Sequence, residues 1–176
     1  MLADAAVLFR TFFRICLLQF SPAQLPRSYE LLAVCLIAYT LVNFLLALFT
    51  APPLDAVLAS LLESLLVALI TVGLLGLHRH YGRWVETLMA LAGTGCILGM
   101  IALPLFYGGT LLRDDSLLQA FMLLVFIALV VWNILIMAHI LRHAASTSFG
   151  LGIVFALAYI FITSAVIAAV LPGLEL

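Results

Sequence analysis

Charged residues are scarce in this sequence. Only 9% of its 176 residues are Asp, Glu, Lys or Arg, whereas 67% are hydrophobic. A soluble domain carries roughly 25% charged residues. This chain therefore has too little charge to cover a surface that faces water. The composition excludes a soluble globular domain and predicts that a lipid bilayer surrounds the protein.

Lysine is absent, and all seven basic residues are arginines, a composition typical of a GC-rich, bacterial genome. The net charge of -1 and the lack of a basic tract exclude a nucleic-acid partner. Cys16, Cys35 and Cys96 have no C-x-x-C spacing and lie in apolar stretches. We therefore expect these cysteines to be small buried side chains.

Sequence patterns typical of enzymes are also missing. The sequence has no Ser-His-Asp arrangement and no H-E-x-x-H motif. Gly93-Thr94-Gly95 lies inside an apolar run and lacks the strand that a nucleotide-binding loop needs. The segments between the apolar runs are too short for a soluble catalytic domain. We therefore predict a protein that is not an enzyme and has no cofactor.

Long apolar runs dominate what is present. A helix that crosses a bilayer needs about 20 apolar residues. Five segments reach this length, and we predict membrane-spanning helices at roughly residues 30–50, 55–77, 84–104, 116–141 and 149–171. The third should end at Pro104, with a loop from there to residue 116. The sequence thus predicts an all-α membrane protein with a five-helix transmembrane domain over residues 29–176.

Residues 1–28 form a separate N-terminal segment. Residues 2–20 are apolar, but Arg10 and Arg14 interrupt them on one helical face. This pattern is typical of an amphipathic helix that lies in the membrane interface. Pro22 and Pro26 then disfavour continuation of that helix.

The arginines predict the orientation of the spans. With a cytoplasmic N-terminus and five crossings, six of the seven arginines lie inside and only Arg113 lies outside. Cytoplasmic loops carry an excess of Lys and Arg. We therefore predict a multi-pass protein of the bacterial inner (plasma) membrane, with its C-terminus on the periplasmic or extracellular side.

Small residues mark the faces where helices are expected to pack. Lipid tails are as apolar as leucine, so close packing must hold membrane helices together. The third span carries Gly93, Gly95 and Gly99, and the fifth carries Gly152 and Ala156 four residues apart. We expect these residues to pack inside one chain. A homodimer face is the alternative.

Four of the polar residues inside the predicted spans are candidates for a site or for contacts between helices. An ionisable side chain in hydrocarbon costs at least ~2.5 kcal/mol, so Glu63 needs an explanation. Asn43 and Ser164 reach a similar depth in other spans, and Asn133 follows Trp132 in the fourth span. A Glu63–Asn43 hydrogen bond that holds the first two spans together is one interpretation. A proton-linked or substrate-binding carboxyl is the other.

The four histidines form a second group, at the predicted cytoplasmic ends of the spans. His78 and His80 end the second span, and His139 and His143 end the fourth, four residues apart. This spacing occurs in helical metal sites, but no nearby Cys or Asp completes a ligand set, although Glu86 is a candidate. We expect histidines that face headgroups and water, with a metal site as the alternative.

The order of these features is typical of one membrane family. A short N-terminal segment ends in a Ser21-Pro22 step before five closely spaced spans. The third span is rich in small residues and precedes Pro104, and the fourth reads VVWNILIMAHILRHA. From about residue 12 to residue 171, the chain resembles the Yip1-type membrane domain in its short bacterial form. The long hydrophilic N-terminal region and the DLYGP element of the eukaryotic members are missing, so the resemblance implies a fold and no site residues.

Two classes of function fit these observations best. The first is a non-catalytic membrane protein that organises or binds other membrane components. The second is a small transporter or an ion- or proton-conducting protein that uses Glu63 and the cytoplasmic-side histidines. A membrane enzyme or haem protein is a third and weaker fit.

Overall fold

The computed structural model describes residues 2–77, 81–111 and 116–171. These residues form six α-helices and two short 3-10 helices, with no strand among them. The α-helices are α1 (Leu2–Cys16), α2 (Tyr29–Ala47), α3 (Pro53–Leu77), α4 (Trp84–Leu111), α5 (Ser116–Ala145) and α6 (Phe149–Val170). The 3-10 helices are η1 (Pro22–Gln24) and η2 (Tyr81–Arg83). The predicted all-α fold is confirmed.

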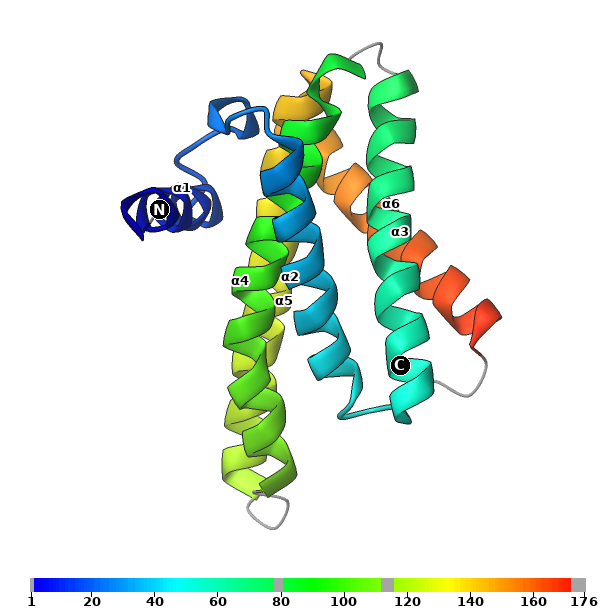
Figure 1. Ribbon diagram of the computed structural model, residues 1–176. Helices are drawn as coiled ribbons and strands as arrows, with labels where there is room; N and C mark the ends of the chain where they lie inside the picture. The colour runs from blue at the N-terminus through cyan, green and yellow to red at the C-terminus, as the bar shows by residue number, and fades with distance from the viewer. Residues whose placement is uncertain (1, 78–80, 112–115, 172–176) are drawn as a thin grey trace.

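Helices α2 to α6 are the five helices within the described residues that are long and apolar enough to cross a membrane. They alternate in direction along the chain, so each runs antiparallel to the next (Figure 1). The prediction of five membrane-spanning helices is therefore confirmed.

Two predicted helix ends were wrong. Helix α4 does not close at Pro104 but continues to Leu111, so the predicted loop begins later. Proline removes one backbone hydrogen bond from a helix, and membrane helices tolerate this loss when neighbouring groups compensate for it. Helix α5 extends past residue 141 to Ala145, with Arg142 and His143 in its last turn. Cations near a helix C-terminus interact favourably with the helix dipole, which supports these extra residues.

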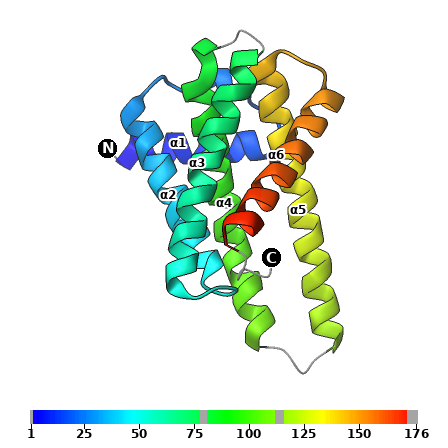
Figure 2. The same ribbon diagram turned by 90° about the vertical axis from the view of Figure 1, so that its right-hand side faces the viewer.

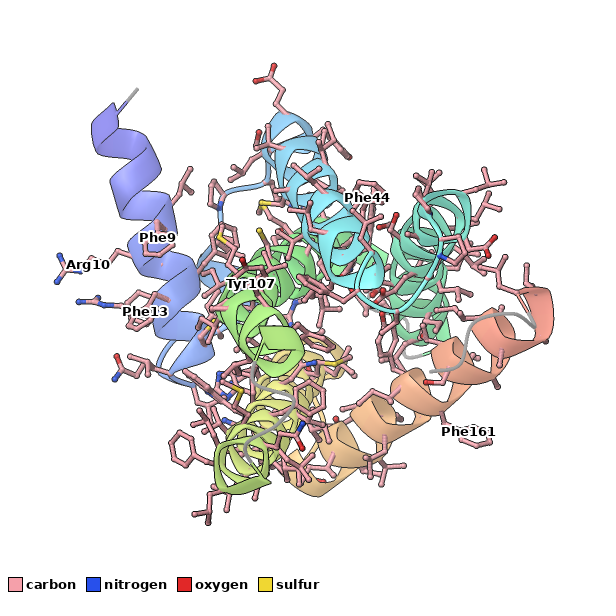
Figure 3. All side chains as sticks on the ribbon, turned by 90° about the horizontal axis from the view of Figure 1, so that it is seen from below. Phe9, Arg10, Phe13, Phe44, Tyr107 and Phe161 are labelled. Atoms are coloured by element: carbon pink, nitrogen blue, oxygen red, sulfur yellow. The ribbon has the colours of Figure 1, made fainter. Side chains whose placement is uncertain are left out.

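Helix α1 lies across the direction of the other helices. Seen from below, α1 runs along the plane of the view, whereas α2 to α5 are viewed nearly end-on (Figure 3). Arg10 extends away from the bundle, while Phe12, Ile15 and Cys16 are buried. This is the orientation that the sequence predicts for a helix in the membrane interface.

Helix α4 is the centre of the bundle. Most of its first 15 residues are buried, and it packs against α1, α2, α3 and α5. Three of its glycines face aromatic or branched side chains: Gly93 faces Phe12, Gly95 faces Tyr39 and Gly99 faces Val42. A methyl group at any of these positions would collide with its neighbour, so the glycines permit close approach.

Helix α6 packs closely on α5 at one end and then diverges from it (Figure 2). At the close end, a Cβ atom on Gly152 would collide with the carbonyl oxygen of Ala138. Ala156, one turn later, is fully buried. At the far end, Ile167 of α6 packs with Ala59 of α3 instead. The five small residues expected at packing faces therefore all lie on buried surfaces within one chain.

Candidate functional site

A cavity of about 370 Å³, the central cavity, lies among helices α2 to α6. The four polar residues singled out inside the predicted spans all line it: Asn43, Glu63, Asn133 and Ser164. From the sequence, Asn43, Glu63 and Ser164 were expected at a similar depth in the membrane. The structure brings them together with Asn133 around one space.

Four further polar residues line the central cavity and were missed in the sequence: Tyr39, Thr94, Tyr159 and Thr163. Tyr39 precedes Asn43 by one turn of α2, and Tyr159 precedes Thr163 by one turn of α6. Residues at i and i+4 share one helical face. Polar pairs at this spacing within apolar helices were the signal that could have found them.

Glu63 has a different partner from the one the sequence suggested. The hydroxyl of Tyr39 donates a hydrogen bond to Oε1 of Glu63, at 2.9 Å. Nδ2 of Asn43 is buried and has no hydrogen-bond partner among the described residues. Glu63 is therefore bonded by Tyr39, and not by the amide nitrogen of Asn43, where the sequence suggested a Glu63–Asn43 hydrogen bond. Tyr39 lies one turn nearer the start of α2, and its longer side chain reaches the carboxyl group.

A second hydrogen bond joins the same two helices one residue further along each. The hydroxyl groups of Thr40 and Ser64 lie 2.6 Å apart. Each hydroxyl has one proton, so one of the two donates to the other. The accepting hydroxyl then donates to a carbonyl of its own helix, that of Ser60 for Ser64 or that of Leu36 for Thr40. Interhelical hydrogen bonds of this kind contribute roughly 0.6–2 kcal/mol each in membrane bundles. The α2–α3 hairpin is therefore held independently of any bond to Asn43.

Several polar atoms in the walls of the central cavity have no partner. Within the part of the chain that the structure describes, Nδ2 of Asn43, Oη of Tyr159 and Oγ1 of Thr163 are buried without a hydrogen bond. Asn133, expected to bond a neighbouring helix, makes no side-chain hydrogen bond to another described residue. An unsatisfied buried polar group costs ~1–3 kcal/mol.

A second cavity, of about 810 Å³, adjoins the central one. Both cavities are lined by Asn43, Glu63, Phe106 and Phe126. The second cavity reaches towards the α2–α3 turn and the α4–α5 end of the bundle, and most of its wall is apolar. Glu63 therefore lies where the central cavity meets the larger second cavity.

Among the described residues, the two cavities carry a negative charge and no positive one. Glu63 is the only charged side chain among the described residues that line either cavity, and no arginine or histidine lines them. Four aromatic residues line the central cavity together with Glu63: Tyr39, Tyr159, Phe106 and Phe126. The last two pack edge to face, with ring centroids 5.5 Å apart.

The histidines at the opposite end of the bundle take structural roles where they are described. Nη2 of Arg142 lies 3.2 Å from Nδ1 of His139. Because a guanidinium only donates, Nδ1 accepts, and Nε2 of the neutral ring then donates to the carbonyl of Phe20 at 3.1 Å. Neither nitrogen of His139 is left for a metal. His143 packs edge to face on His139, while His78 and His80 lie outside the described residues.

His139 and Trp132 together fasten the N-terminal segment to α5. Nε1 of Trp132 donates to the carbonyl of Cys16 at 2.9 Å. These two residues of α5 are seven positions apart, about two helical turns, so they share one face. A third link joins the N-terminal segment to α4 instead, through the ion pair between Arg27 and Glu86 at 2.6 Å. Glu86, a candidate metal ligand in the sequence, is therefore paired with an arginine.

No group of three or more His, Cys, Asp or Glu residues is arranged to hold a metal ion within residues 2–77, 81–111 and 116–171. In comparisons with protein-family models, with curated proteins and with solved structures, nothing matches this chain. Any function must therefore be argued from the central and second cavities themselves.

Proposed function

We propose that this protein is a non-catalytic, multi-spanning membrane protein that binds another membrane component inside its helix bundle. The observation that supports this proposal most is the central cavity with its polar wall. The helices around this cavity lack, at the cavity, the close packing on which membrane bundles depend. Its volume of about 370 Å³ is within the roughly 300–1,000 Å³ typical of small-molecule sites.

We further propose that the bundle lies in a bacterial inner membrane with a cytoplasmic N-terminus. Arg27, Arg83 and Arg142 support this orientation, because they gather at one end of the bundle. Arg83 bonds the carbonyl of His143, and Arg27 pairs with Glu86. The short bacterial form of the Yip1-type domain remains our proposed family, supported by the five-span order and by the Trp132–His139 run.

Identification of co-purifying small molecules tests the binding function. The protein is purified in native nanodiscs, and extracted compounds are quantified per chain by mass spectrometry. Ala102→Leu narrows the central cavity, whereas Gly73→Leu adds a leucine side chain where a Cβ atom would meet nothing within 4 Å. We expect a compound that is present in the wild type and Gly73→Leu and depleted in Ala102→Leu. Equal amounts in all three samples would refute the proposal.

Transport of a solute or ion is the second candidate function. It is favoured by the position of Glu63, which lines both cavities. A carboxyl group at such a junction suits a site that exchanges a cation or proton between two compartments. Flux into proteoliposomes that disappears in Glu63→Gln, with normal insertion, would favour transport over binding alone.

A further inference from the structure

The carboxyl group of Glu63 is unusual because its hydrogen-bond partner is a neutral hydroxyl. Intramembrane acids normally pair with a base or with one another. Here Oε1 accepts from Tyr39, and none of the described residues that line the two cavities is basic. The carboxylate form therefore has no counter-charge among the described residues of the two cavities. A bound cation would supply one.

The surroundings of Glu63 select among cations. A small hydrated ion needs several polar ligands, whereas the second cavity offers mostly apolar and aromatic surface. Aromatic faces attract cations, most strongly where water is excluded. Tyr39, Tyr159, Phe106 and Phe126 supply such rings in the wall of the same cavity. This wall suits a charge that is attached to an apolar body.

The same wall disfavours the other two charge types. An anionic headgroup would meet Glu63 with no basic side chain to balance it, and like-charge contacts cost several kilocalories per mole. An uncharged amphiphile would fit the apolar surface but would leave the carboxylate without a counter-charge. A cationic amphiphile would supply a counter-charge for Glu63 and an apolar body for the second cavity.

We propose that the two cavities together bind an organic cation with an apolar body, such as a lipophilic amine or phosphonium. The charge lies beside Glu63, and the apolar body extends into the second cavity along Phe106 and Phe126. This inference rests on the proposed binding function and names the class of its ligand.

Three probes of one shape and different charge test the inference. Tetraphenylphosphonium is a cation, tetraphenylborate an anion and tetraphenylsilane uncharged. Binding to the full chain in nanodiscs is measured by equilibrium dialysis, with empty nanodiscs subtracted. We expect saturable binding of one tetraphenylphosphonium per chain, and no saturable binding of the other two probes.

Variants of Glu63 show whether its charge is responsible. Glu63→Gln keeps an acceptor for Tyr39 and removes the charge, so we expect at least tenfold weaker binding of tetraphenylphosphonium. Glu63→Asp keeps the charge and should retain binding within about tenfold of the wild type. Glu30→Gln removes an exposed carboxylate from the first turn of α2 and should bind like the wild type. Thermal unfolding of each variant checks that the bundle is folded.

Three outcomes would overturn the inference: no saturable binding of the cation, equal binding of all three probes, or unchanged binding in Glu63→Gln. The proposed binding function is judged separately. A neutral or anionic compound that co-purifies with the wild type and is depleted in Ala102→Leu would leave that function standing while this inference fails.

Discussion

Tyr39 and Gly95 are in direct contact where α2 packs on α4. A Cβ atom at position 95 would lie 2.6 Å from Cε2 of the Tyr39 ring, so only glycine leaves room for the ring. The hydroxyl of the same ring donates to Glu63 on α3. The position of Glu63 therefore depends on a glycine of a helix that does not carry it.

Gly95→Ala is expected to destabilise the bundle by about 1–3 kcal/mol, because an added methyl group in a close-packed interface forces its neighbours to move. The displaced Tyr39 ring would also lose its bond to Glu63. Unfolding in a mixed detergent system measures the change. Gly73→Ala is the matched control, since a Cβ atom there meets nothing within 4 Å. Equal stability of the two variants would contradict this account.

Glu63→Gln should change stability little, by less than about 1 kcal/mol, because the amide oxygen still accepts from Tyr39. Tyr39→Phe, in contrast, removes the donor and should cost roughly 0.6–1.7 kcal/mol. Tyr29→Phe controls for the substitution, since Tyr29 is 71% exposed. Unfolding measurements on the three variants would show whether the carboxyl group is retained for stability. A large loss in Glu63→Gln would mean that it is.

The sequence predicted the membrane-spanning helices of this site but not the hydrogen-bond partner of Glu63. Hydropathy located all five spans, because each is apolar over the thickness of a bilayer. It could not show which residue bonds Glu63, because Tyr39 and Asn43 lie one turn apart on the same face of α2. Depth alone favoured Asn43, and the neighbour one turn away, Tyr39, forms the bond. Pro104 was misjudged because rules from soluble helices were applied to a membrane helix.

Trp132→Phe is expected to loosen the N-terminal segment, because it removes the hydrogen bond to the carbonyl of Cys16. Burial raises the pKa of the Cys16 thiol to about 12, so little thiolate is present at pH 8. Once the segment loosens, this pKa falls towards its ordinary value and the thiolate fraction at pH 8 rises. Maleimide labelling of Cys16 should then be severalfold faster.

The labelling experiment uses a protein in which Cys35 and Cys96 are replaced by alanine, so that maleimide can react only with Cys16. Trp84→Phe serves as the control, since its ring contacts Tyr29 of α2, whereas the bond to the carbonyl of Cys16 comes from Trp132. Unchanged labelling in Trp132→Phe would show that the other contacts of the segment hold it without this bond.

Zinc content should be the same in the wild type and in His139→Ala. Both ring nitrogens of His139 already have hydrogen-bond partners, Arg142 and the carbonyl of Phe20. Elemental analysis of the two purified proteins, after dialysis against zinc and then buffer, measures this. If His139→Ala lost one equivalent of zinc, the hydrogen-bonded role assigned to the ring would be wrong.

The histidines show a second limit of sequence reasoning. A His pair at i and i+4 predicts shared ligation only if both rings are free, and the sequence does not show what each ring already bonds. His139 is engaged by a backbone carbonyl 119 residues away. Every residue has a main-chain carbonyl, so no sequence pattern shows which one bonds a given side chain. The same holds for Trp132 and the carbonyl of Cys16.

These two long-range bonds set a condition on biogenesis. Trp132 is 116 residues from its partner, and His139 is 119 residues from its own. Chains emerge from the ribosome N-terminus first, so α1 is synthesised before α5 and has no docking surface on it until four later helices exist. Helix α1 must therefore wait for these helices before it can reach its final place against α5.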